Sequence, residues 1–223
     1  VGSRNNFFGT RSGTYNSIGN DNLFAGTCSG YGNTSGSCNV YLGVAAGYGN
    51  TTLGTGSQNI FIGYRAGYGV STGSNVIAIG QNAGNDAVLN ISTGSTISNA
   101  IVLGNNSHTN AFIKVNWTVT SDERDKTNIV SLPLGLDFIE QLNPVQYNWK
   151  DREDGKIIDT VPRYGFLAQD IQKLEGKPKV IVDENDPENL KLRESMIIPV
   201  LVNAVKELSA ELRELKSKLG ISS

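Results

Sequence analysis

A serine and a lysine stand five residues apart in the segment Ser121-Asp122-Glu123-Arg124-Asp125-Lys126, and together they could carry nucleophilic chemistry. A serine hydroxyl attacks a carbonyl when a neighbouring group accepts its proton, and a neutral lysine can be that group. The chain has one histidine, His108, and none within reach of this segment, which excludes a Ser–His–Asp arrangement. The remaining chemistry is attack of Ser121 on the carbonyl of Thr120, which would cut the chain at the Thr120–Ser121 bond.

Lys126 would act as the base in this reaction, and an ester formed at Ser121 would then be hydrolysed to release the C-terminal fragment. The lysine of such a pair must be neutral, which burial or a nearby cation such as Arg124 favours. Asp122 is a supporting candidate that could orient the site or cap the following turn. The non-catalytic alternative is that Ser121 and Asp122 form a helix N-cap or turn and that Lys126 is an ordinary surface lysine.

The spacing of the pair constrains which element can hold it. A separation of five residues along a helix rotates two side chains apart by roughly 140°, so a helix would place them on different faces. The segment must therefore be a loop or turn, or the lysine must come from a neighbouring chain. In the second case, cleavage would depend on the assembly of chains.

This segment also lies on a sharp boundary in composition. Residues 1–120 are rich in Gly, Asn, Ser and Thr, and their only charged residues are Arg4, Arg11, Arg65, Lys114, Asp21 and Asp86. Only five of the 26 glycines follow Ser121. The 223 residues are enough for two small domains, and we expect them at 1–120 and 121–223.

The first part of the chain contains a repeat in which Asn, a short apolar run and Gly are followed by a second Gly. The copies are Asn6-Phe7-Phe8-Gly9, Asn22-Leu23-Phe24-Ala25-Gly26, Asn39-Val40-Tyr41-Leu42-Gly43, Asn59-Ile60-Phe61-Ile62-Gly63, Asn75-Val76-Ile77-Ala78-Ile79-Gly80 and Asn99-Ala100-Ile101-Val102-Leu103-Gly104. The Gly that ends each run recurs at intervals of 17, 17, 20, 17 and 24 residues. Such self-similarity indicates a repeat architecture.

Each apolar run is short and rich in β-branched and aromatic residues, which predicts a strand rather than a helix. The glycines permit the positive φ that tight corners need. One such coil cannot bury its apolar face alone, but stacked coils, or three chains around a common axis, can. We therefore expect a trimeric β-helix or β-prism-like shaft with strands from three chains facing one core. The alternative is a monomeric β-solenoid.

The remainder of the chain predicts a small α+β domain. Residues 111–120 alternate in polarity, which predicts a strand leading into the junction, with Trp117 as a core anchor. Beyond the junction, the patterns predict a short helix at 132–142, a strand at 145–149, a strand or turn at 164–169, a short helix at 170–174 and a strand at 180–182.

The longest predicted helix covers residues 195–219 and stops at Gly220. Its apolar residues recur at alternating spacings of four and three, as the a and d positions of a coiled coil do; they are Leu201, Val205, Leu208, Leu212, Leu215 and Leu219. The alternative is an amphipathic helix packed on its own domain, which Pro199 near its first turn allows for the proximal part. We expect the distal part to assemble between chains.

Composition excludes several other functional classes. The net charge of −2 provides no field that would attract nucleic acid or an anionic membrane, and no apolar run is long enough to span a bilayer. The single histidine and the spacing of Cys28 and Cys38 do not fit a metal site, so we expect free thiols, no metal and no cofactor. The acidic loop at 183–189 lacks the spacing of a calcium-binding loop.

From Ser121 to its end, the chain resembles the C-terminal intramolecular chaperone domain of phage tail fibres, tailspikes and endosialidases, a self-processing module that also occurs in myelin regulatory factor. The resemblance rests on Ser121-Asp122-x-Arg124-x-Lys126-x-Asn128-Ile129, Leu142-Asn143-Pro144-Val145-x-Tyr147-x-Trp149, Tyr164-Gly165-Phe166-Leu167-Ala168-Gln169-Asp170 and Ala204-Val205-Lys206-Glu207-Leu208. The order of these four motifs makes the match specific. The repeat half is similar, less specifically, to trimeric β-structured shafts of phage fibres and of trimeric adhesins.

The resemblance implies a homotrimer that belongs to a virion, as a tail fibre or spike assembled in the host cytoplasm. The C-terminal domain would trimerise through the helix at 195–219, hold the chains in register and chaperone folding of the shaft. It would then cut itself off before Ser121, as an intramolecular serine peptidase that acts once. The shaft could bind a host-cell receptor, glycan or protein. Nucleic acid, membrane insertion, metals and cofactors have no place in this scheme.

Two alternatives stay open. The first is a structural, receptor-binding fibre tip whose C-terminal domain trimerises the chains and stays attached. It gains weight from Tyr164, because the family often has His near this position. The second is a carbohydrate-degrading tailspike, which would need two converging carboxylates. Asp21 and Asp86 are the only carboxylates of residues 1–120 and stand far apart in the repeat, which argues against it.

Overall fold

The computed structural model describes residues 2–49, 54–85, 97–152 and 154–221. The chain forms two compact units, Val1–Phe112 and Ile113–Ser223. The sequence predicted domains at 1–120 and 121–223, and that boundary stays a prediction.

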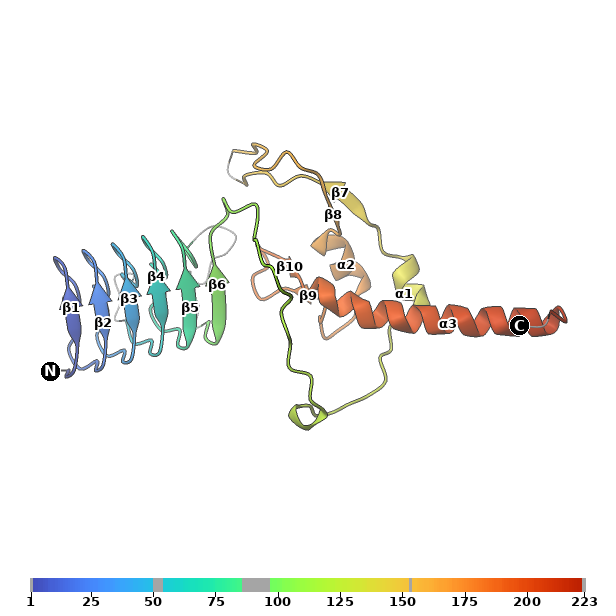
Figure 1. Ribbon diagram of the computed structural model, residues 1–223, viewed down its shortest axis with the longest axis horizontal. Helices are drawn as coiled ribbons and strands as arrows, with labels where there is room; N and C mark the ends of the chain where they lie inside the picture. Colours follow the sequence, from blue (N-terminus) through green and yellow to red (C-terminus); the bar gives the residue numbers. More distant parts are fainter. Residues whose placement is uncertain (1, 50–53, 86–96, 153, 222–223) are drawn as a thin grey trace. The chain divides into compact units, whose positions relative to one another are not determined.

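The first unit is a β-solenoid built on one parallel sheet. Its strands are β1 (Asn6–Phe8), β2 (Leu23–Ala25), β3 (Val40–Leu42), β4 (Ile60–Ile62), β5 (Val76–Ile79) and β6 (Ala100–Leu103), stacked in sequence order (Figure 1). Every strand lies within one of the predicted apolar runs, and each run pairs in register with the next. The predicted fold class, a β-repeat half followed by a small α+β half with a long terminal helix, is confirmed.

The middle residue of each three-residue strand, β1 to β4, is aromatic, and these rings stack on one another in the row that Ala78 of β5 and Val102 of β6 continue. Ring centroids of Phe7, Phe24, Tyr41 and Phe61 are separated by 5.0, 4.7 and 4.8 Å in turn, close to the spacing of neighbouring strands. Phe24 and Phe61 are fully buried. A single chain therefore buries Phe24, Tyr41 and Phe61 by stacking its own coils, without the predicted core shared between three chains. Trimeric assembly of the shaft stays a prediction.

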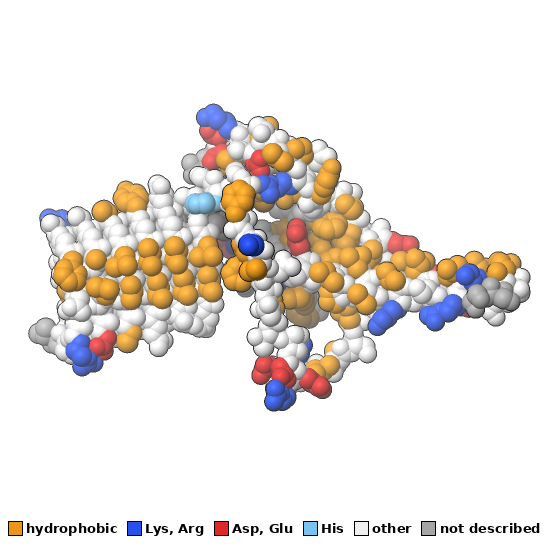
Figure 2. Space-filling view, viewed as in Figure 1, with side chains coloured by type: hydrophobic (Ala, Val, Ile, Leu, Met, Phe, Trp, Pro, Cys, Tyr) orange, Lys and Arg blue, Asp and Glu red, His pale blue; other side chains and the backbone are white. Residues whose placement is uncertain are grey.

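Apart from Asn6 in β1, the residues on either side of these inward positions point outward and are also apolar. They form one row of Leu23, Val40, Ile60, Ile77 and Ile101, and a second row of Phe8, Ala25, Leu42, Ile62, Ile79 and Leu103. Figure 2 shows apolar side chains running across the stacked coils. We call these two rows the outer aliphatic face.

The glycines that end the strands are required by close stacking of the coils. Gly43 has φ +132°, and a Cβ built on it would lie 2.6 Å from the carbonyl oxygen of Gly63 in the next coil. Gly26 and Gly63 meet the following coils in the same way. A side chain at these positions would collide with backbone, so the repeated Gly reflects both conformation and space.

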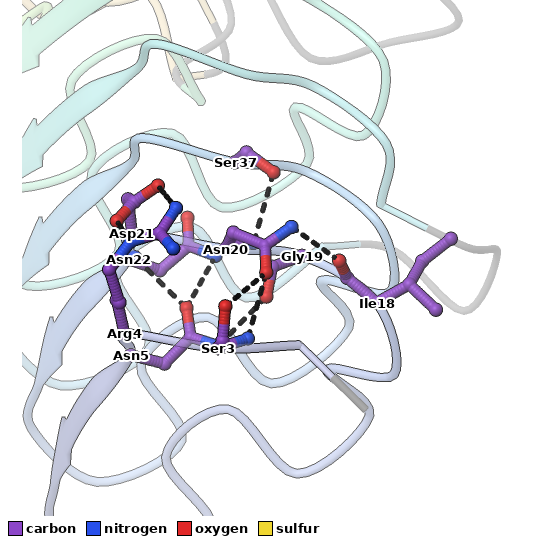
Figure 3. A network of polar contacts seen from close by, with 9 residues as sticks. All are labelled: Ser3, Arg4, Asn5, Ile18, Gly19, Asn20, Asp21, Asn22 and Ser37. Carbon is purple, nitrogen blue, oxygen red and sulfur yellow. Dashed lines mark hydrogen bonds and ion pairs between the residues drawn. The ribbon is translucent and has the colours of Figure 1, made fainter.

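A row of asparagines closes the corner before the strands. Asn39 accepts a hydrogen bond from the backbone N–H of Asn59 and donates one to the carbonyl oxygen of Gly56, both at 2.9 Å. The same pattern links Asn5 to Asn22 at the first coils, where Arg4 also pairs with Asp21 (Figure 3). These buried amides satisfy backbone groups that the corner would otherwise leave without partners.

The second unit contains a small helical core. Its elements are a 3₁₀ turn η1 (Glu123–Asp125), α1 (Leu136–Glu140), β7 (Val145–Tyr147), β8 (Arg163–Gly165), α2 (Ala168–Leu174), β9 (Val182–Asp183), β10 (Lys191–Leu192), η2 (Glu194–Met196) and α3 (Ile197–Lys218). Phe138, Ile171, Ile181, Val182, Ile197 and Val200 form the buried core. The helices expected at 132–142, 170–174 and 195–219, and the strand expected at 145–149, are therefore present.

The long helix α3 has two different parts. Its proximal residues Ile197, Val200 and Ala204 are buried in the unit. The distal a and d residues are exposed: Leu208 at 54%, Leu212 at 51% and Leu215 at 53%. The proximal part thus packs on its own domain, as Pro199 allowed, whereas the distal apolar stripe has no partner within the described residues of this chain.

The strand predicted at residues 111–120 is absent, and Trp117 is 76% exposed rather than a core anchor. A strand needs a neighbour for its backbone N–H and C=O groups. None of the described strands pairs with this segment, so the alternating pattern alone was misleading.

Candidate self-processing site

The segment that begins at Ser121 folds into a single capped turn. The Asp122 side chain accepts a hydrogen bond of 2.9 Å from the backbone N–H of Arg124, and η1 follows. The backbone N–H of Lys126 then bonds to the carbonyl oxygen of Glu123 at 3.0 Å. Asp is a favoured capping residue because its short carboxylate reaches the N–H groups of a first turn. The expectation of a turn rather than a regular helix is met here.

This turn brings the predicted pair together. The Nζ of Lys126 lies 2.7 Å from the Oγ of Ser121 and 3.1 Å from the carbonyl oxygen of the same serine. Lys126 has extended backbone angles (φ −119°, ψ 150°), which end η1 and let the side chain return toward Ser121. The contact forms within one chain, so the geometry does not require a lysine from a neighbour.

Asp122 and Arg124 form an ion pair across the same turn. The guanidinium Nη2 of Arg124 lies 2.6 Å from a carboxylate oxygen of Asp122. The hydrogen bond from Arg124 holds the pKa of the Asp122 carboxyl below its usual range. Arg124 was expected to favour a neutral lysine, but its charge is largely offset by Asp122. Asp122 therefore caps the turn and pairs with Arg124, and its supporting role in cleavage stays a prediction.

Thr120, Ser121 and Lys126 are exposed in the single chain. In this arrangement the ammonium of Lys126 donates to the hydroxyl, and a neutral amine at the same distance could accept the hydroxyl proton. Water stabilises the charged form of lysine, so exclusion of water would favour the form that the reaction needs. The turn brings the two side chains into contact. A segment that covered the site would exclude water and so favour the neutral lysine.

Two hydrogen bonds join α3 to the segment that follows the site, and they were not predicted from the sequence. Glu207 accepts a hydrogen bond of 2.6 Å from the backbone N–H of Leu136, and Asn203 donates one of 2.8 Å to the carbonyl oxygen of Leu134. Gly135, the residue before α1, has no side chain to cap it. The glycine before a short helix was the available signal, because such a helix needs its cap from elsewhere.

The other residues singled out in the sequence lie elsewhere. Tyr164 is on β8 and 83% exposed, while Asp21 is paired with Arg4 at 2.5 Å. Asp86 lies outside the described residues. Cys28 and Cys38 are free thiols, as predicted. Across the part of the chain that the structure describes, no group of His, Cys, Asp and Glu could hold a metal ion, and no helix has the length and apolarity to cross a membrane.

A protein-family model described as chaperone of endosialidase, under the name Peptidase S74, matches residues 121–180. The chain is also similar to long tail fiber protein Gp37 of Enterobacteria phage K3 and of Enterobacteria phage T2, each 35% identical over 107 residues. These matches cover 47% of this chain and 8% of each relative. No solved structure matches the chain. The resemblance of the C-terminal half to the phage tail fibre chaperone family is confirmed.

Proposed function

We propose that this chain is the C-terminal part of a phage tail fibre in which residues 121–223 trimerise the chains, assist folding of the shaft and then cut themselves off at the Thr120–Ser121 bond. The observation that carries the proposal is the 2.7 Å contact between Ser121 and Lys126. It lies at the first residue of the segment that matches the chaperone family.

The cleavage would proceed in two steps. Lys126 takes the proton of the Ser121 hydroxyl, and Oγ forms a bond to the carbonyl carbon of Thr120. The C–N bond of Thr120–Ser121 breaks, and the Ser121 nitrogen takes the proton, which leaves an ester between Thr120 and Oγ. Water then hydrolyses this ester. The products are a shaft that ends in the Thr120 carboxylate and a fragment that begins with a free Ser121, so the enzyme acts once.

Trimerisation is assigned to the distal part of α3. Its a and d residues stay exposed although the helix is long and regular. Helices with such a seam bury it against one another in a coiled coil.

The repeats explain why a shaft of this kind would need a trimerisation domain that is later removed. Consecutive coils are nearly alike, at intervals of 17, 17, 20, 17 and 24 residues, so chains or coils paired one repeat out of register would be close in energy. A domain that fixes the register first removes these alternatives. Cleavage afterwards would leave the shaft kinetically trapped rather than reversibly assembled.

The second candidate, a fibre tip that trimerises and keeps its C-terminal domain, is favoured by the exposure of Lys126 and by Tyr164. Under both proposals the chain is part of a virion assembled in the host cytoplasm. The shaft surface is where a host receptor, glycan or protein, would bind.

Light scattering combined with a denaturing gel on the wild-type chain separates the candidates. A trimer that yields a shorter C-terminal fragment supports the proposal. A trimer of full-length chains supports the uncut fibre tip instead, and a stable monomer contradicts both.

A further inference from the structure

The outer aliphatic face of the shaft consists of apolar residues where a sheet that meets water would carry polar ones. From β2 to β6 every outward residue of the register is Ala, Val, Leu or Ile. Several are well exposed, with Ile60 at 36%, Ile79 at 40% and Ile101 at 70%. Strands that are apolar on both sides are typical of sheets buried on both faces, so this face is built to be covered.

The extent of the face indicates what can cover it. Six strands at ~4.8 Å and three residues at ~3.3 Å give a footprint on the order of 300 Å². A stable complex between free proteins buries about 800 Å² on each partner. An untethered protein would therefore bind this face weakly. A partner already held nearby can use so small a surface, because tethering raises its effective concentration to the millimolar range.

A second copy of this chain is the partner that meets this condition. Copies joined through α3 would hold their shafts together, and identical coils would present identical rows at the same heights. The face also has two parallel rows, one for each neighbour in a closed ring. In a three-fold ring, the first row of each copy would meet the second row of the next, which is a heterologous contact that closes.

We propose that the outer aliphatic face is the surface on which copies of the shaft pack, with the row of Ile60 in one copy against the row of Ile62 in the next. This inference rests on the trimerisation assigned to α3 in the proposed function. It differs from a shared aromatic core, because each chain keeps its own row of Phe24, Tyr41 and Phe61 closed inside its coils. Assembly would add contacts outside a finished coil rather than complete its interior.

Cross-linking of single thiols on the full chain tests this arrangement. The background carries Cys28→Ser, Cys38→Ser and Ser121→Ala. Chains with Ile60→Cys are co-expressed with differently tagged chains that carry Ile62→Cys, and a bis-maleimide that spans roughly the 10 Å between packed sheets is added. One thiol per chain means that every cross-link joins two chains. Chains with Tyr64→Cys and Thr72→Cys, both exposed and outside the strands, are the matched control.

The expected result is a trimer by light scattering and covalent dimers that carry both tags for the Ile60 and Ile62 pair, with at least tenfold less product for the control pair. The same test one coil along, with Ile77→Cys and Ile79→Cys, guards against a local folding defect. A trimer without cross-links at either coil overturns the outer face as the interface but leaves trimerisation standing. A monomer overturns both.

Discussion

The Nζ of Lys126 donates a hydrogen bond of 2.7 Å to the Oγ of Ser121, across a turn that Asp122 caps. Five residues separate the two, and only a break in helical geometry after η1 allows them to meet. The same side chain also reaches the carbonyl oxygen of Ser121 at 3.1 Å. Within a short exposed segment, this contact joins the two side chains that we propose as the nucleophile and its base.

Replacement of Lys126 should abolish cleavage without preventing assembly. Lys126→Ala removes the side chain that contacts the Ser121 hydroxyl, and we expect at least a hundredfold slower cleavage, since general bases contribute factors of about 10²–10⁴. A denaturing gel over time measures the rate. Lys156→Ala, at an exposed lysine that pairs with Asp154, is the control. Cleavage at the wild-type rate in Lys126→Ala would show that another group is the base.

Co-expression of two inactive chains should show whether the pair works within one chain. Chains with Ser121→Ala are mixed with differently tagged chains with Lys126→Ala, so that mixed trimers contain an intact serine and an intact lysine on separate chains. Because the contact forms within one chain, we expect no cleavage. Cleavage of the Lys126→Ala chain, measured by intact mass, would mean that the lysine comes from a neighbour.

The cap at Asp122 should matter through the turn that it holds. Asp122→Ala removes both the acceptor for the Arg124 N–H and the partner of its guanidinium, and we expect cleavage to slow several-fold. Asp122→Asn keeps an acceptor and should retain most of the rate. Gel time courses of the two variants give the comparison. Equal loss of rate in both would assign the effect to the charge of Asp122 and not to the cap.

The lowered pKa of Asp122 gives the turn a pH dependence with a defined sign. Its carboxylate is hydrogen-bonded in the folded turn, so this stabilisation is complete above the ordinary aspartate pKa of about 3.9 and is lost as the pH falls through the lower folded value. The amide signal of Arg124 in an arginine-labelled Ser121→Ala chain should therefore stay constant from pH 7 to 5 and move only at more acidic pH. A midpoint above the ordinary aspartate range would contradict the hydrogen bond.

Close stacking of the coils predicts a sharp cost for a side chain at Gly43. An added Cβ would lie 2.6 Å from the carbonyl oxygen of Gly63, in a backbone conformation that favours glycine. We expect Gly43→Ala to lower the free energy of unfolding of the shaft by about 1–3 kcal/mol or more. Thermal unfolding on the Ser121→Ala background measures this change. Gly176→Ala, where an added Cβ meets nothing within 4 Å, should have little effect. Equal stability of the two variants would refute the stacking.

Much of the shaft was predictable from its repeats, because one apolar run specifies one strand and the intervals specify the register. The row of non-glycine residues with left-handed backbone angles was not predictable from the repeats. Asp21, Cys38 and Gln58 have φ of +57°, +59° and +61°. Hydrogen bonds between coils hold these corners, and a local sequence pattern carries no signal of bonds to a residue 17 or 20 positions away.

At the candidate site, the sequence narrowed the possible arrangements of Ser121 and Lys126 but did not select one. The five-residue spacing excluded a helix, yet it could not distinguish a turn from a neighbouring chain. In the single chain, the turn that Asp122 caps brings the two side chains together, and action of Lys126 within its own chain stays a prediction. The glycine before α1 signals that a cap is missing, but the sequence does not identify Glu207 and Asn203 as its source, because their partners lie 71 and 69 residues away. Trp117 was misplaced because alternation alone does not supply a partner strand.

The most direct test of self-cleavage is intact mass spectrometry on the wild-type chain and on Ser121→Ala, produced identically. The account predicts a wild-type fragment whose first residue is Ser121, together with a shaft ending at Thr120, and only full-length chain in the variant. A wild-type chain that stays full length while forming trimers would contradict self-cleavage and leave a permanent trimerising tip.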